Sequence, residues 1–136
     1  AAALGVSRNS VADYCLYIEE AGLIAQLRDD TGGIRGLGKV DKIYLDNTNL
    51  IYNLGGEGAE IGNVRETFFF NQMRVGHDVI NSSVSDFMID GFTFEVGGRR
   101  KGKKQIEGVP NAFVVKDDIE FASGNTIPLW HFGFDY

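Results

Sequence analysis

Apolar positions in the first fifty residues follow a helical spacing and then a strand-like one. Between Ser7 and Gly22 they recur every three or four residues, which predicts a helix with one buried face. Ser7 can cap its first turn, and Gly22 can end it in a left-handed conformation. Residues 23–27 and 42–45 are expected as strands on either side of a turn at residues 29–33. The positions expected on the buried face are Val11, Tyr14, Cys15, Ile18 and Ala21.

A glycine-rich stretch at residues 55–62 separates this region from a second one and is expected to be a flexible linker. The second region begins with a helical pattern over residues 63–74. Strand-like runs follow at 79–83, 86–89, 92–96, 112–115 and 127–130, with a turn at 123–125. We therefore predict an α+β chain with domains at 1–54 and 63–136.

The dipeptide Asp90-Gly91 favours a two-residue hairpin turn between the runs at 86–89 and 92–96. Such a turn places Asp86 opposite Glu95, with Cβ atoms about 5 Å apart on one face of the hairpin. Two carboxylates at that distance repel each other. A bound Mg²⁺, a shared proton or separation into solvent would each relieve the repulsion. Glu66, in the preceding helix, adds a third carboxylate.

The residues Leu4-Gly5-Val6-Ser7 have the pattern of a helix-turn-helix corner. The two strands that follow the helix complete the pattern of a winged helix. Little remains of the helix that should come before the corner, so we expect this chain to be a piece of a longer protein. A winged helix can read DNA or serve protein contacts, and both alternatives stay open. The side chains expected on the front of the recognition helix are Arg8, Asn9, Ser10 and Asp13.

Charge and composition exclude several classes of protein. The net charge of −6 argues against a protein that coats nucleic acid by electrostatics alone. The loop after residue 98 is nevertheless basic, which fits a phosphate-binding patch or a solvated surface loop. The single Cys15 excludes a disulfide framework. No apolar run is long enough to span a bilayer, so we expect a cytoplasmic protein without a membrane partner. The basic residues of the loop are Arg99, Arg100, Lys101, Lys103 and Lys104.

The order of a helical glutamate and a hairpin that carries two acids resembles the PD-(D/E)XK nuclease core. In that core, the acids hold a metal that activates water for phosphodiester cleavage. The last motif of the core should read Glu-x-Lys, but here it reads Glu95-Val96-Gly97. The lysine is missing, and Lys101, Lys103 or Lys104 could fold back to replace it.

Longer segments resemble the C-terminal region of bacterial and archaeal AAA-type ATPases, which is described as a domain of unknown function. The segments are Ser7-Arg-Asn-Ser-Val11, Glu20-Ala-Gly-Leu-Ile24, Lys42-Ile-Tyr-Leu-Asp46, Asn63-Val-Arg-Glu-Thr-Phe-Phe-Phe-Asn71, Phe94-Glu-Val-Gly-Gly98 and Lys104-Gln-Ile106. The resemblance implies a partial winged helix followed by a small restriction-endonuclease-like mixed sheet with a flanking helix. It also implies a separate N-terminal ATPase domain that would bind ATP, since this chain has no Gly-Lys-Ser/Thr motif.

The catalytic roles follow from the resemblance to the nuclease core, and the DNA contacts follow from the helix-turn-helix pattern and the basic loop. Glu66, Asp86, Glu95 and Lys101 are the expected catalytic residues, and Asp86 and Glu95 are the expected Mg²⁺ ligands. DNA contacts are expected from Arg8, Asn9, Ser10, Arg99, Arg100, Lys103 and Lys104. We expect a DNA-binding, nuclease-like module with weak or absent activity. The alternative is an inactive nuclease-like fold that serves protein interaction or oligomerisation, with the ATPase domain or further copies of the chain as partners.

Overall fold

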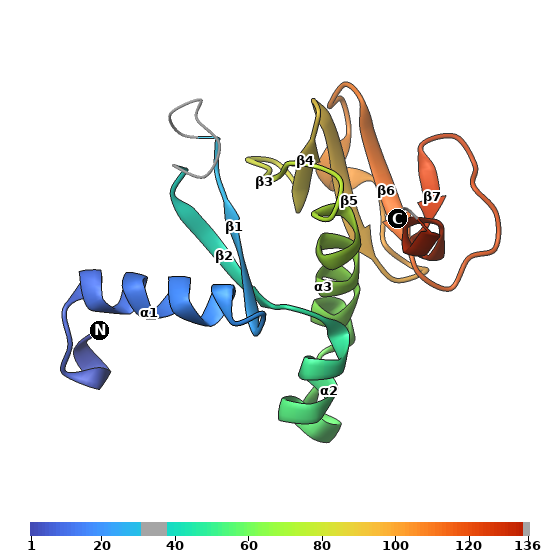
Figure 1. Ribbon diagram of the computed structural model, residues 1–136. Helices are drawn as coiled ribbons and strands as arrows, with labels where there is room; N and C mark the ends of the chain where they lie inside the picture. The colour runs from blue at the N-terminus through green and yellow to red at the C-terminus, as the bar shows by residue number, and fades with distance from the viewer. Residues whose placement is uncertain (31–37, 135–136) are drawn as a thin grey trace.

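The computed structural model describes residues 1–30 and 38–134, except for the side chain of Glu57, and shows an α+β fold around a mixed sheet (Figure 1). The turn expected at residues 29–33 lies mostly outside the described residues. No described helix is both long and apolar enough to cross a bilayer. The three α-helices are α1 (Arg8–Glu20), α2 (Thr48–Gly55) and α3 (Ile61–Met73). Short 3₁₀ helices are η1 (Ala2–Leu4), η2 (Gly56–Gly58), η3 (Lys104–Ile106) and η4 (Leu129–Phe134).

Seven strands form one sheet in the order β2-β1-β3-β4-β5-β6-β7. Neighbours pair antiparallel in β1–β2, β3–β4 and β4–β5, and parallel in β1–β3, β5–β6 and β6–β7. Strands from both regions of the sequence thus share the sheet, although the division into two domains stays a prediction. The strands are β1 (Ile24–Arg28), β2 (Val40–Leu45), β3 (Val79–Asn81), β4 (Phe87–Ile89), β5 (Phe92–Gly97), β6 (Ala112–Lys116) and β7 (Thr126–Pro128).

The predicted bounds of α1 are confirmed, but its predicted buried face is wrong. The Ser7 hydroxyl accepts a hydrogen bond from the Ser10 N–H at 3.0 Å, and Gly22 has a φ of 71°. No residue of α1 is buried, and Tyr14 and Ile18 are 48% and 40% exposed. The physical reason is visible in Figure 1, where α1 extends away from the sheet beyond the β1–β2 hairpin instead of lying against it.

The stretch expected as a flexible linker has regular secondary structure. Residues 55–62 contain the end of α2, the 3₁₀ helix η2 and the start of α3. Asn47 caps α2, because its side-chain oxygen accepts from the N–H groups of Asn49 and Leu50. Gly56 has a φ of 53°, a conformation that glycine adopts without strain. The glycines therefore serve a tight connection between two helices.

The hairpin at Asp90-Gly91 is confirmed. Both turn residues have positive φ, and Ile89 pairs with Phe92, as a two-residue turn requires. The ladder continues outward to Phe87 and Phe94. The strand expected at 127–130 is only partly correct, because β7 ends at Pro128 and the chain continues into η4. Proline has no N–H for the sheet ladder, so it is suited to a strand end.

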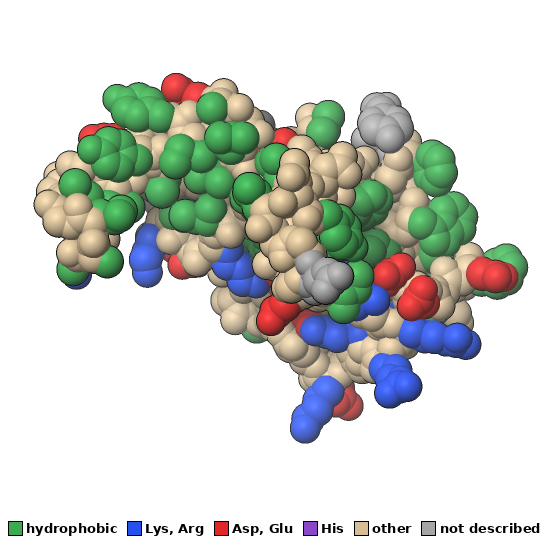
Figure 2. Space-filling view, turned by 90° about the horizontal axis from the view of Figure 1, so that it is seen from below, with side chains coloured by type: hydrophobic (Ala, Val, Ile, Leu, Met, Phe, Trp, Pro, Cys, Tyr) green, Lys and Arg blue, Asp and Glu red, His purple; other side chains and the backbone are tan. Residues whose placement is uncertain are grey.

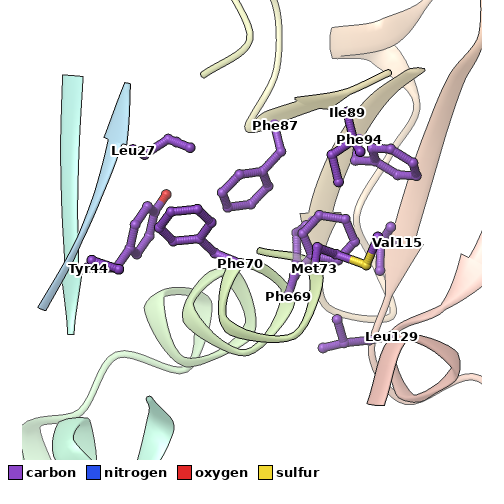
Figure 3. Close-up of a cluster of buried hydrophobic side chains, with 12 residues drawn as sticks. Leu27, Tyr44, Phe69, Phe70, Met73, Phe87, Ile89, Phe94, Val115 and Leu129 are labelled. Atoms are coloured by element: carbon purple, nitrogen blue, oxygen red, sulfur yellow. The ribbon is translucent and has the colours of Figure 1, made fainter. Parts of the chain in front are cut away.

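The main core joins α3 to one face of the sheet (Figure 3). The helix contributes Phe69, Phe70 and Met73, which point at aromatic and aliphatic side chains from both halves of the chain. The ring centroids of Phe69 and Phe87 lie 5.2 Å apart, and those of Tyr44 and Phe70 lie 5.4 Å apart. Glu66 lies on the same helix, so this packing fixes its position next to β2. The residues labelled around the helix are Leu27, Tyr44, Phe87, Ile89, Phe94 and Val115 from the sheet and Leu129 from η4.

Candidate active site

The structure brings together the four residues predicted as catalytic. Glu66 lies in α3, Asp86 directly precedes β4, Glu95 lies in β5, and Lys101 lies in the following loop. One more step of the β4–β5 register beyond Phe87 and Phe94 puts Asp86 opposite Glu95. The carboxylates of Glu66 and Glu95 both act electrostatically on Asp86, and all three acids act on Lys101. The four side chains therefore form one charged cluster.

Glu95 is the most buried member of this cluster, with no exposed surface. Its Oε2 lies 2.5 Å from the Ser85 hydroxyl, which also lies 2.9 Å from the Phe94 carbonyl oxygen. Its Oε1 is paired with the Lys101 ammonium. A buried carboxylate is costly unless it is paired, so Lys101 supplies the charge that Glu95 needs.

Gly97 makes room for this lysine. A Cβ atom on Gly97 would lie 2.7–2.8 Å from Cβ, Cγ and Cδ of Lys101. The Lys101 side chain thus crosses the strand where the side chain of the expected Glu-x-Lys lysine would begin. Burial alone would lower the pKa of Lys101, but the hydrogen bond and charge of Glu95, with the charges of Asp86 and Glu66, raise it overall. Lys101 stays protonated at neutral pH.

Asp86 is held from both sides. Its Oδ2 accepts a hydrogen bond from the Val96 N–H at 2.8 Å, and its Oδ1 lies 3.7 Å from Nζ of Lys42. Burial raises the pKa of Asp86 above its ordinary value, and the charges of Glu66 and Glu95 add to this effect. The Val96 hydrogen bond and the Lys42 charge act in the opposite direction. Asp86 therefore protonates more readily than an ordinary aspartate.

Two further members of the cluster, Tyr44 and Lys42, were not predicted. The Tyr44 hydroxyl donates to Oε2 of Glu66 at 2.7 Å, and Lys42 Nζ lies 3.6 Å from the same oxygen. Burial raises the pKa of Tyr44, with further contributions from the hydrogen bond and charge of Glu66. The alternation of β2 puts residues 42 and 44 on one face, and this signal is present in the sequence. The sequence interpretation assigned β2 to another domain and so did not connect it with Glu66.

The acids fit Mg²⁺ only in part. Within residues 1–30 and 38–134, no three His, Cys, Asp or Glu side chains are grouped closely enough to hold a metal ion. Mg²⁺ is commonly bound by one or two carboxylates and several waters. Asp86 with one adjacent glutamate meets that smaller requirement. Oδ1 of Asp86 and Oε2 of Glu66 already share one cation, because Lys42 Nζ lies 3.7 and 3.6 Å from them. The donor set therefore suits a water-rich, two-carboxylate site.

The residues expected to contact DNA lie in two separate places. Arg8 and Asn9 are exposed at the start of α1, whereas the Ser10 hydroxyl lies 2.9 Å from the Ser7 hydroxyl within the helix cap. Four basic side chains of the loop after β5 are exposed: Arg99, Arg100, Lys103 and Lys104. Figure 2 shows Lys and Arg gathered at one end of the molecule, with acids among them, while apolar side chains cover much of the other end.

A groove of about 380 Å³ lies between β2, α2 and the start of α3. Tyr44, Ile51 and Asn63 line it, together with the buried Thr67, but none of the three carboxylates does. The cluster itself is therefore the better candidate for chemistry.

Comparison with known proteins returned no relatives. No family model matches the chain, no curated protein is significantly similar to it, and no solved structure resembles it significantly.

Proposed function

We propose that this chain is a DNA-binding, nuclease-like module with weak metal-dependent phosphodiester cleavage, and that it belongs to a larger ATPase. The observation that carries the proposal is the pairing of Lys101 with the buried Glu95, beside Asp86 and Glu66. These are the residue types of a PD-(D/E)XK site, with the lysine supplied from the following loop. The specific fold, a winged helix followed by a restriction-endonuclease-like sheet, is part of the same proposal.

Each side chain has a definite task in this proposal. Asp86 would hold Mg²⁺ together with one of the flanking glutamates, Glu95 or Glu66. The bound metal would lower the pKa of water to generate the nucleophile. Lys101, fixed by Glu95, would stabilise the negative charge that develops on the phosphate. Ser85 and the Val96 N–H keep the carboxylates of Glu95 and Asp86 oriented.

Three observations support a weak activity. The described acids form no three-ligand group, Lys42 already neutralises part of the charge of Glu66 and Asp86, and the chain has a net charge of −6. A site with fewer ligands and partly neutralised acids attracts a metal less strongly, and an acidic protein attracts DNA less strongly.

The basic loop is the proposed phosphate-binding element. It follows directly from β5, so Lys101 reaches the acids while Arg99, Arg100, Lys103 and Lys104 remain in solvent. A hydrogen bond from Lys116 to the Arg99 carbonyl oxygen, at 3.4 Å, links the loop to the end of β6. DNA that contacts these four side chains would lie next to the acidic cluster. Such binding should weaken with salt, because it depends on phosphate contacts.

The second candidate is an inactive nuclease-like fold used for protein interaction or oligomerisation. It is favoured by the apolar side chains that α1 leaves exposed, among them Tyr17 at 65% and Leu16 at 43%. Exposed apolar patches often mark interaction surfaces. This candidate predicts a mass that increases with protein concentration in analytical ultracentrifugation and no cleavage with any metal.

Cleavage of branched, single-stranded and duplex DNA with Mg²⁺ or Mn²⁺ tests the proposal. We expect slow cleavage by the unmodified chain, and its loss in Asp86→Asn and Glu95→Gln. Glu107→Gln, which changes an exposed acid outside the cluster, is the matched control and should leave the rate unchanged. Cleavage that survives in both cluster variants would contradict the proposed site.

A further inference from the structure

Lys42 contacts two acids of the charged cluster and takes no direct part in the proposed cleavage. Its Nζ lies 3.6 Å from Oε2 of Glu66 and 3.7 Å from Oδ1 of Asp86, so a single ammonium group spans two carboxylates that belong to different elements. The residue comes from β2, at the edge of the sheet, whereas Glu66 comes from α3 and Asp86 directly precedes β4. Its position is thus set by how β2 packs next to α3.

We propose that Lys42 is a built-in counter-cation that competes with a divalent metal for Glu66 and Asp86. The inference deepens the proposed function, because it concerns how the same acidic cluster is loaded with metal. Without a cation at this position, two carboxylates would face each other in a half-buried setting and destabilise the fold. With Lys42 present, the charge of Glu66 and Asp86 is partly neutralised in the metal-free protein, and a metal must displace the ammonium group.

Exposure and anchoring of the side chains make such an exchange feasible. The Lys42 side chain is 41% exposed, so its flexible stem can swing into solvent without opening the core. Glu66 and Asp86 would keep their orientation after that movement. The Tyr44 hydroxyl holds Oε2 of Glu66, and the Val96 N–H holds Oδ2 of Asp86. The two acids are fixed and the lysine is movable, as a displaceable cation requires.

Lys101 is not the displaceable cation. It pairs with Glu95, whose side chain has no exposed surface, and its stem packs across Gly97. Removal of Lys101 would leave a buried charge without a partner, which is costly. Metal entry at Lys42 leaves the pair of Lys101 and Glu95 intact.

The test is Mn²⁺ binding to the full chain, measured by isothermal calorimetry or by the electron paramagnetic resonance signal of free Mn²⁺. We expect Lys42→Met to bind Mn²⁺ roughly tenfold more tightly than the unmodified chain, which corresponds to about 1.4 kcal/mol. Lys42→Arg keeps the positive charge and should not gain affinity. Lys39→Met is the matched control, because Lys39 is exposed on the same hairpin and has no ion pair with the cluster. Equal or weaker binding by Lys42→Met would overturn the proposal.

A second measurement needs no variant and so remains valid if Lys42→Met does not fold. Acetylation of individual lysines by a soluble reagent can be followed by mass spectrometry with and without Mn²⁺. We expect Mn²⁺ to increase the reactivity of Lys42 severalfold and to leave Lys39 unchanged, because the displaced ammonium group moves into solvent. Unchanged reactivity of Lys42 at saturating Mn²⁺ would overturn the proposal.

The two proposals can fail separately. Tighter Mn²⁺ binding by Lys42→Met, abolished by the added change Asp86→Asn, supports the competition even if no DNA is cleaved. In that case only the proposed nuclease activity is contradicted. If neither the unmodified chain nor Lys42→Met binds Mn²⁺ at millimolar concentrations, although both are folded, the proposed competition between Lys42 and the metal is overturned. This holds whatever the cleavage assay shows.

Discussion

At the residue scale, Gly97 permits the contact between Lys101 and Glu95. Alanine at this position would put a Cβ atom within 2.7–2.8 Å of three carbon atoms of the lysine stem. Because these atoms belong to a flexible side chain, we expect Gly97→Ala to displace Lys101 and to weaken its ion pair. The expected loss is about 1–2 kcal/mol of unfolding free energy, since a buried carboxylate loses much of its partner. Urea unfolding at neutral pH measures it.

The matched control for this prediction is Gly102→Ala, because a Cβ atom there would meet nothing within 4 Å. Its stability should change by less than about 0.5 kcal/mol. Alanine is intrinsically better than glycine within a strand. A neutral or stabilising effect of Gly97→Ala would therefore contradict the importance of the lysine contact.

Asp86 gives a prediction about pH. Its pKa is raised in the folded protein from an ordinary value of 3.8, so folding favours the protonated form. The stabilisation of the fold by protonated Asp86 is complete below pH 3.8. It is lost as the pH rises through the higher pKa of Asp86 in the folded protein. Asp86→Asn mimics the protonated form and still accepts from the Val96 N–H. The stability of Asp86→Asn relative to the unmodified chain should therefore increase from strongly acidic pH to neutral pH.

Urea unfolding of both proteins between pH 3 and pH 8 tests this expectation. Asp118→Asn, which changes an exposed aspartate after β6, is the control and should show no such trend. A relative stability of Asp86→Asn that falls as the pH rises would show that the cluster favours the charged form of Asp86.

The sequence revealed part of this cluster through local geometry. The Asp90-Gly91 turn determines the β4–β5 register, and the register puts Asp86 next to Glu95. Lys101 was named as the expected catalytic lysine, but local geometry did not distinguish it from Lys103 and Lys104, which lie in the same segment after β5. Lys42 and Tyr44 were missed because their contacts with Glu66 depend on long-range packing of β2 against α3.

At the scale of elements, α1 is held to the sheet by a polar contact. Oε1 and Oε2 of Glu19 accept hydrogen bonds from the backbone and side-chain nitrogens of Gln26, at 2.7 and 2.8 Å. We expect Glu19→Ala to increase hydrogen exchange at the Gln26 amide roughly tenfold, which corresponds to loss of about 1.4 kcal/mol. Glu20→Ala, at the exposed neighbouring position, should leave this exchange unchanged. Equal exchange in the two variants would exclude Glu19 as the tether.

The bounds of α1 and the β4–β5 hairpin were predictable because caps and turns are local signals. Ser7 and Gly22 bound α1, and Asp90-Gly91 marks the hairpin. The buried face of α1 was wrong because periodicity shows that a helix is amphipathic but not whether anything covers it. The stretch from Gly55 to Gly62 was misinterpreted because glycine serves tight helix connections as well as flexible linkers.

At the scale of the whole molecule, the sheet links the two regions of the sequence. Tyr44 lies in β2 at one edge, and Trp130, the only tryptophan, lies in η4 after β7 at the other edge. Tyr44→Phe removes a hydrogen bond to a carboxylate but keeps the ring in the core, so we expect a loss of about 1.5 kcal/mol. If the sheet unfolds as one unit, Trp130 fluorescence and far-ultraviolet circular dichroism should shift together.

Tyr52→Phe is the control for this prediction, because Tyr52 is 53% exposed. A Trp130 transition that stays unchanged in Tyr44→Phe while the circular dichroism shifts would instead support two independent domains.

We propose that the cluster around Lys101 is a phosphodiester-cleaving site, and substitution of Lys101 tests this proposal. The measurement is the rate of DNA cleavage at saturating Mn²⁺ by Lys101→Met and Lys103→Met, with folding of each checked by Trp130 fluorescence. The second variant changes an exposed lysine of the same loop and alters the net charge equally. We predict that Lys101→Met loses about 10²–10³ in rate, as other preorganised charge-stabilising groups do, while Lys103→Met loses little. Equal rates for the two folded variants would contradict the claim.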